Sequence, residues 1–318
     1  MDCTDPRTLC KGKHGWIGLL GILAFPLASI ASPQEDAIRK AAGLVAKSAG
    51  SYIEKRDCIS CHHQSLPMWA LGQAGFGKGL PAQKEYIEDY FEGRLEQMAK
   101  GQRVIGGPYT AGYALAGMAE SGGKPSPTTD ALVQYLRHSQ HKDGSWRIRT
   151  HRPPLEDSHF TATALAIRGM LAYGKPKDGV VKAAKTWLLT NNPTSTEDYV
   201  FQVLGVHWAG SKVEPHGQEL LRLQREDGGW GQLPSMESDA YATGMSLFAL
   251  RETGIIETSD CAYESGVKWL LDHQQVDGSW HVRSRSKPIQ QYFDSGFPHG
   301  KDQFISIAAT CWAILALH

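Results

Sequence analysis

Three copies of one short segment constrain the fold more than any other feature of this chain. They align without gaps, begin at Gln140, Gln224 and Gln274, and read QHKDGSWRI, QREDGGWGQ and QQVDGSWHV. Each follows an apolar helical pattern: ALVQYLRHS, GQELLRL and GVKWLLDH. The Asp-Gly pair predicts a tight turn in which glycine takes the positive φ, and the tryptophan offers a large face to the neighbouring unit. A recurring helix–turn unit of this kind predicts stacked helical units.

Two kinds of helix alternate along the chain. Segments such as EDAIRKAAGLVAKSAGSYIEKR and AQKEYIEDYFEGRLEQMAKG have a charged face, whereas FTATALAIRGMLAYG and FISIAATCWAILAL carry small or apolar residues on most faces. The first kind predicts helices on the outside and the second predicts helices crowded on all sides. Six outer helices are expected to begin near Glu35, Pro81, Thr128, Asp178, Glu214 and Asp260, and six inner ones near His62, Tyr109, His159, Asp198, Ala240 and Gln303.

The C-terminus indicates that these helices close into a ring. An open solenoid needs a polar capping unit at each end, yet this chain finishes on the apolar CWAILALH. No linker is long or polar enough to divide the chain. We therefore expect an all-α fold, one (α/α)6 toroid over residues 32–318.

The Q-x-x-D-G-x-W segments resemble the QW repeats of squalene–hopene and oxidosqualene cyclases, whose superfamily shares its toroid with protein prenyltransferase β-subunits. The resemblance covers most of the chain from about residue 100 onward. It implies a terpenoid cyclase-like barrel with an apolar central cavity for an isoprenoid-like ligand.

The chemistry of those enzymes is not reproduced in the motifs. The sequence has no adjacent Asp-Asp pair, so it lacks the acid motif Asp-x-Asp-Asp of the cyclases and the magnesium motif Asp-Asp-x-x-Asp. The segment MESDAYATG at 236–244 has no cysteine after Asp239, so the prenyltransferase zinc pair is also missing. Asp239 and Glu156 are candidate acids, and Asp239 equally suits the N-cap of the following helix. Whether the protein is an enzyme stays open at this point.

The overall charge and two arginine-rich segments indicate which classes of ligand the protein can bind. The chain has 33 basic and 33 acidic residues, which argues against a nucleic-acid partner. After the first and third repeat tryptophans come WRIRTHRP and WHVRSRSKP. If both loops lie on one rim, their arginines would face an anion such as a carboxylate, phosphate or haem propionate. Ion pairs within the rim are the alternative; the four arginines are Arg147, Arg149, Arg283 and Arg285.

The N-terminus has the form of a secretory signal peptide over residues 1–31. Basic residues precede the apolar run WIGLLGILAFPLASIAS, with Ser29 and Ala31 at −3 and −1 of a cut. A run of roughly 15 apolar residues is short for a membrane span, although an uncleaved anchor is the alternative. We expect a periplasmic or secreted protein without a stable membrane span after cleavage.

The segment DCISCHHQSLPM at 57–68 contains the Cys-x-x-Cys-His pattern at Cys58, Cys61 and His62. In an exported protein this pattern predicts covalent c-type haem, with both thiols bonded to the haem and His62 as the iron ligand. Zinc held with the help of His63 and a structural disulfide are the alternatives. The sixth iron ligand is not identified by the pattern; the candidates by position are His159, His207, His281 and His299.

These observations predict an exported toroid with one haem, acting as a redox protein or oxidoreductase that meets a redox partner and takes an isoprenoid-like ligand. A haem-free terpene cyclase-like or prenyltransferase-like enzyme is the first alternative. A non-catalytic toroid that binds a ligand through its arginine rim is the second. For Cys261 and Cys311, a mutual disulfide and buried free thiols are both open.

Overall fold

The computed structural model describes residues 31–77, 80–174, 179–288 and 291–318. The predicted signal peptide lies almost entirely outside these ranges. Where the structure is described, all regular elements are helices, and one isolated β-bridge joins Arg152 to Glu156. None of the described helices combines the length and apolar character needed to cross a bilayer.

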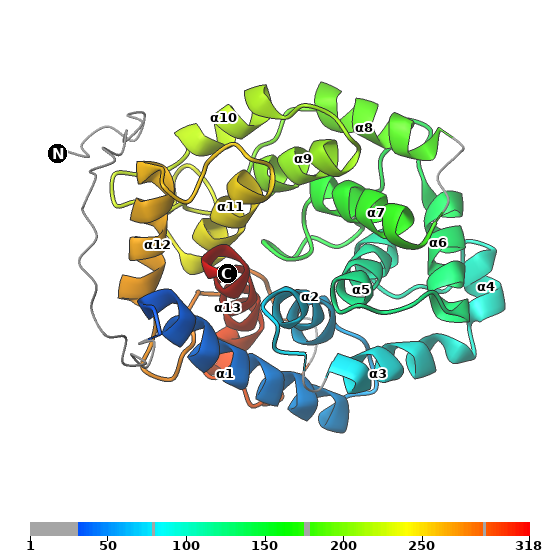
Figure 1. Cartoon of the computed structure of the whole chain (residues 1–318). Coiled ribbons are helices and arrows are strands. Elements are labelled where there is room, and N and C mark those ends of the chain that lie inside the picture. Colours follow the sequence, from blue (N-terminus) through cyan, green and yellow to red (C-terminus); the bar gives the residue numbers. More distant parts are fainter. Residues whose placement is uncertain (1–30, 78–79, 175–178, 289–290) are drawn as a thin grey trace, which may run out of the picture.

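Two concentric rings of helices form the toroid, which confirms the predicted fold (Figure 1). The inner ring contains α2 (Leu66–Gln73), α5 (Gly107–Glu120), α7 (His159–Tyr173), α9 (Thr196–Trp208), α11 (Ala240–Glu252) and α13 (Gln303–Leu317). The outer ring contains α1 (Pro33–Lys55), α3 (Leu80–Glu92), α6 (Pro127–Ser139), α8 (Val180–Thr190), α10 (Glu214–Arg222) and α12 (Cys261–His273).

The structure departs locally from the expected helices at two places. The segment 82–101 was predicted as one outer helix, but α3 ends at Glu92 and a short α4 (Leu95–Ala99) follows. Gly93 lies at the break, where the entropic cost of a helical glycine favours an interruption. The first inner helix begins with a π-helical turn over Cys61–Ser65 before α2 continues it.

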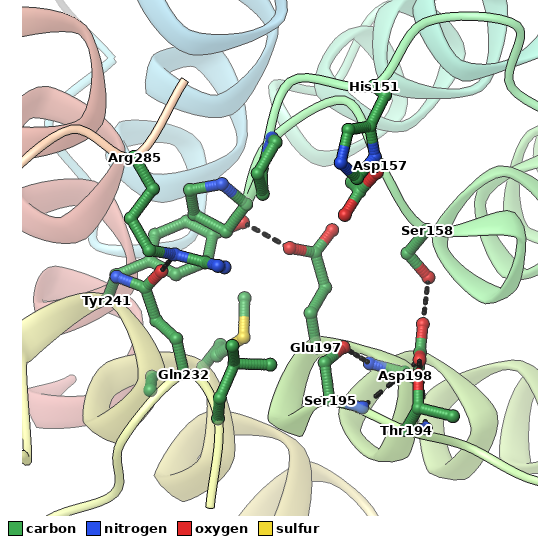
Figure 2. Close-up of a pocket in the computed structure, with 15 residues that line it drawn as sticks. His151, Asp157, Ser158, Thr194, Ser195, Glu197, Asp198, Gln232, Tyr241 and Arg285 are labelled. Atoms are coloured by element: carbon green, nitrogen blue, oxygen red, sulfur yellow. Dashed lines mark hydrogen bonds and ion pairs between the residues drawn. The ribbon is translucent and has the colours of Figure 1, made fainter. Parts of the chain in front are cut away.

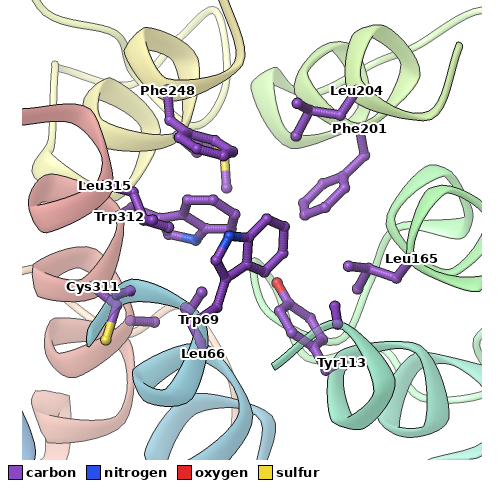
Figure 3. Packing of buried hydrophobic residues seen from close by; sticks show 14 of the residues in the cluster. Leu66, Trp69, Tyr113, Leu165, Phe201, Leu204, Phe248, Cys311, Trp312 and Leu315 are labelled. Atoms are coloured by element: carbon purple, nitrogen blue, oxygen red, sulfur yellow. The ribbon is translucent and has the colours of Figure 1, made fainter. Parts of the chain in front are cut away.

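Small residues allow the inner helices to approach one another closely. A Cβ added to Gly244 in α11 would lie 2.8 Å from the backbone nitrogen of Ala313 in α13. Inside the ring, large aromatic side chains meet (Figure 3): the rings of Trp69 and Trp312 are 5.6 Å apart, and Phe248 lies 5.7 Å from Trp312. These side chains fill the region where the resemblance implied an apolar central cavity.

The repeats act as joints between neighbouring units. Each repeat tryptophan is buried, and its Nε1 donates to the carbonyl ten residues earlier in the preceding outer helix, at 2.7 to 3.0 Å. Each repeat glutamine donates both to its own turn and to a carbonyl near the start of the next outer helix. Those acceptors are Val180 for Gln140, Ala262 for Gln224 and Ala37 for Gln274.

The third joint closes the ring. Gln274 follows α12, and its acceptor Ala37 lies in α1, 237 residues earlier. Helix α1 also packs against α13. The toroid is therefore closed rather than an open solenoid.

Candidate functional site

A cavity of about 290 Å³ lies at the end of the toroid where the inner helices begin (Figure 2). The first turns of α9 and α11 form part of its wall, and the segment 151–158, which leads into α7, forms another part. The side chains that line it are His151, Pro153, Pro154, Asp157, Ser158, Thr194, Ser195, Glu197, Asp198, Gln232, Leu233, Tyr241, Ala242, Met245 and Arg285.

Capping residues determine where these helices start. Ser158 accepts from the Thr161 amide at the start of α7. Ser195 forms a capping box with Asp198 at the start of α9, and Asp239 caps α11. Side-chain acceptors of this kind satisfy the free first-turn amides, so the three helix starts are well defined and bring their first-turn side chains to one cavity.

Glu197 is the carboxylic acid at the centre of this cavity. Its side chain is 4% exposed, and it accepts hydrogen bonds from Thr161 Oγ1 at 2.6 Å and from the Tyr241 phenol at 3.1 Å. Burial raises the pKa of Glu197 well above its usual value, the neighbouring charge of Asp198 adds to this, and the two hydrogen bonds offset it only in part. Glu197 is thus suited to hold a proton that it can donate.

Asp198 has a different role, although it is adjacent in sequence. Its carboxylate accepts from the Ser158 hydroxyl at 2.6 Å, from the Thr194 amide and hydroxyl at 3.0 Å each, and from the Ser195 amide at 3.2 Å. Four donors occupy this carboxylate, which ties the start of α9 to the start of α7 and supports the wall beside Glu197.

The two acids predicted from the sequence do not line this cavity. Asp239 Oδ1 accepts from the amides of Tyr241 and Ala242 at 2.9 and 3.0 Å, the capping role that the sequence also indicated, and burial raises its pKa to about 6. Glu156 pairs with Arg152 at 3.1 Å on the segment that covers the site. Sequence reasoning missed Glu197. The available signal was an acidic pair in STEDYVFQVLGVHW at the start of an otherwise apolar inner helix.

The four rim arginines do not converge. Arg147 pairs with Asp143 at 2.6 Å, while Arg149 and Arg283 are exposed and contribute nothing to the wall of the cavity. Arg285 does line it, and its Nε donates to Gln232 Oε1 at 2.7 Å.

The Cys-x-x-Cys-His segment lies at the same end of the toroid, in the turn that leads into α2. Cys58 and Cys61 are free thiols, and Cys58 Sγ is 3.2 Å from the Tyr52 hydroxyl. His62 Nδ1 lies 3.0 Å from Ser60 Oγ and 2.5 Å from His63 Nδ1. Burial and the nearby charge of Arg152 lower the pKa of His62 to about 3, so this imidazole is neutral at physiological pH.

The two alternatives for this segment were zinc and a disulfide. Within the described ranges no three or more His, Cys, Asp or Glu side chains are grouped so as to hold a metal ion. The free thiols rule out a Cys58–Cys61 disulfide in this state. Elsewhere, Cys261 is disulfide-bonded and Cys311 is a buried free thiol, so the two do not bond to each other.

The residue types here fit covalent haem, but the packing leaves little room. The cavity that touches His62 measures about 30 Å³, and Arg152–Glu156 form one wall of it. That volume is far smaller than a porphyrin, so haem attachment would require segment 152–156 to move. Haem at Cys58, Cys61 and His62 stays a prediction.

Comparison with known proteins gives consistent matches to one fold. The family model described as prenyltransferase alpha-alpha toroid domain matches residues 58–285. A squalene–hopene cyclase from Bradyrhizobium diazoefficiens is 25% identical over 189 residues, which cover 57% of this chain and 23% of that enzyme. The chain therefore spans less than a quarter of that relative.

Solved structures resemble the whole toroid at low sequence identity. A variant of the type II terpene cyclase MstE from Scytonema, in complex with its substrate geranylgeranyl dihydroxybenzoate, has a TM-score of 0.53 and 13% identity, covering 89% of this chain and 97% of that one. A possible member of the GH105 family from Salmonella enterica has a TM-score of 0.53 and 12% identity, covering 93% and 95%. At these identities the likeness concerns the fold.

Proposed function

The chain belongs to the prenyltransferase alpha-alpha toroid family, and from that premise we propose that it is an enzyme that donates a proton from Glu197 to a carbon–carbon double bond of an isoprenoid-like substrate. The observation that carries this proposal is the buried carboxylic acid at the cavity, with its pKa raised and with Thr161 and Tyr241 bonded to it.

The proposed step follows from the surroundings of this acid. A buried carboxyl group stays protonated at a pH where an exposed one is ionised. Transfer of its proton forms a C–H bond at one alkene carbon, leaves a carbocation at the other and leaves a carboxylate at Glu197. The hydroxyls of Thr161 and Tyr241 then stabilise that carboxylate by hydrogen bonds. The carbocation is resolved by ring closure onto a second double bond and loss of a proton, or by addition of water.

An isoprenoid-like substrate is the choice that the relatives favour. MstE is named with a geranylgeranyl substrate, and the curated relative is a squalene–hopene cyclase. In this chain Pro154, Leu233 and Met245 supply apolar surface beside Glu197. An alkene chain lying on these residues would have a double bond within reach of the acid.

Deuterium incorporation tests the proposal directly. Purified protein is incubated in D₂O with a panel of prenylated compounds, and products are examined by mass spectrometry. We expect one deuterium on carbon in the product of native protein and of the control Glu156→Gln, and none with Glu197→Gln. Product formation that survives Glu197→Gln would exclude Glu197 as the proton donor.

Covalent haem in an exported redox protein is our second proposal. It rests on two free thiols and an imidazole in one turn, the donor set that attachment needs. Protein exported from cells with haem-attachment machinery should then show a Soret band that survives denaturation and is lost in Cys58→Ala. N-terminal sequencing of the same material tests cleavage after Ala31. Colourless protein would leave the acid chemistry of Glu197 as the function.

A further inference from the structure

Arg285 is the one arginine among the residues that line the 290 Å³ cavity, and no lysine lines it. His151 is paired with Asp157. Asp198 accepts four hydrogen bonds from its own loop and the start of α7. Burial raises the pKa of Glu197, which favours the uncharged form of that side chain. Arg285 also lines the wall and forms no ion pair with a carboxylate of the described ranges; its charge lowers the pKa of the nearby buried Asp239.

The orientation of Arg285 is also defined. Its Nε donates to Gln232 Oε1 at 2.7 Å, and Gln232 is 3% exposed. The backbone carbonyl of Gln232 in turn accepts from the Thr196 amide at 3.1 Å, at the start of α9. The bond at Nε leaves the two terminal nitrogens of the guanidinium for another acceptor. Figure 2 shows Arg285 and Glu197 directed into the same space from different walls.

We propose that Arg285 binds the carboxylate of the substrate, so that the substrate class is an isoprenoid-like carboxylic acid. The planar guanidinium fork matches a carboxylate with two parallel hydrogen bonds. A diphosphate would bring several negative charges to a wall that supplies one arginine and no lysine. The inference that the carbon chain is isoprenoid-like rests on the proposed function. The inference that the substrate carries a carboxylate rests on Arg285 alone.

Binding measurements with two matched probes test this site without requiring turnover. Geranic acid and geraniol share one carbon skeleton and differ in the carboxylate. By titration calorimetry we expect native protein to bind geranic acid at least about tenfold more tightly than geraniol, because hydrogen bonds to charged groups are stronger than neutral ones. The variant Arg285→Gln should lose this preference and bind the two probes about equally.

The neighbouring rim arginine provides a matched control. Arg283 follows the same repeat tryptophan but is exposed and outside the cavity, so Arg283→Gln should keep the preference for the acid. Thermal unfolding confirms that each variant is folded. Equal binding of the probes by native protein, a preference that survives Arg285→Gln, or tighter binding of geranyl diphosphate would each overturn the carboxylate site.

The variant Glu197→Gln separates this inference from the proposed function. It should keep the preference for geranic acid, since no proton is transferred on binding. If Glu197→Gln remains active while Arg285→Gln loses the preference, the proton donor is wrong and the carboxylate site stands. If Glu197→Gln is inactive and Arg285→Gln keeps the preference for geranic acid, the carboxylate site is wrong and the proposed function stands.

Discussion

The phenol of Tyr241, in the first turn of α11, donates a hydrogen bond over 3.1 Å to Oε2 of Glu197, in the first turn of α9. The two residues are 44 positions apart in sequence and are both buried. This bond joins neighbouring inner helices and positions the acid at the cavity. It also provides a donor that favours the carboxylate once a proton has left.

Glu197→Gln should lower kcat by about 100-fold or more, the usual contribution of a general acid. In native protein, activity should fall as pH rises through the raised pKa of Glu197, because only the protonated form donates. Tyr241→Phe removes a hydrogen bond that lowers that pKa, so this fall should move to higher pH. Rate against pH for native protein, Tyr241→Phe and the control Glu156→Gln measures both effects. An unchanged profile in Tyr241→Phe would contradict the assignment.

Asp239 should make the free energy of unfolding depend on pH. Its folded pKa is about 6, above the ordinary 3.8, so between these values the folded state binds more protons than the unfolded state. Stability is therefore highest below about pH 4 and is lost as pH rises through 6. Asp239→Asn keeps a capping side chain and should remove this dependence. Urea denaturation from pH 4 to pH 8 measures this dependence. The same change in the free energy of unfolding with pH in native protein and in Asp239→Asn would contradict it.

Gln274→Ala should weaken the closure of the ring. It removes the hydrogen bonds to the carbonyls of Ala37 and Gly278, at 2.9 and 3.1 Å, and we expect a loss of about 1–3 kcal/mol. Hydrogen exchange in α1 should become faster. Gln140→Ala removes the equivalent bonds to Gly144 and Val180 and serves as the control. Similar protection of α1 in both variants would mean that Gln274 has no special part in closure.

Gly278→Ala should destabilise the protein more than Gly254→Ala. Both glycines have positive φ, +91° and +69°, so both substitutions impose backbone strain of about 1–2 kcal/mol. A Cβ at Gly278 would also lie 2.8 Å from the carbonyl carbon of Lys40, whereas nothing lies within 4 Å at Gly254. The difference in free energy of unfolding between the variants measures this close approach of the repeat turn to α1. Equal losses would contradict it.

Local patterns in the chain predicted much of the architecture. Helix caps and turn glycines depend on residues a few positions away, so Asp239 could be identified as a cap, and Gly144, Gly228 and Gly278 do take positive φ. The repeat glutamines and tryptophans marked the joints for the same reason. The break at Gly93 was missed because a single glycine is often tolerated in a helix.

The candidate site could not be predicted from local sequence patterns to the same extent. Glu197 acquires its raised pKa mainly from burial, and the charge of Asp198 adds to it. The extent of that burial is decided by tertiary packing and cannot be read from neighbouring residues in sequence. The four rim arginines could not be distinguished by sequence, because the first and the third repeat are each followed by two of them. Only Arg285 lines the cavity, because the loop after the third repeat turns inward to Gln232.

The sequence by itself determined the alternation of outer and inner helices and the turns that join them, because helix periodicity, capping and glycine conformation are local properties. Only the tertiary structure decided that α1 completes the ring, that aromatic side chains fill its centre, and that Glu197, Tyr241 and Arg285 share one cavity. Those outcomes depend on burial and on contacts between residues far apart in sequence, such as Gln274 and Ala37, which are 237 positions apart. The same residue types would have other properties in solvent.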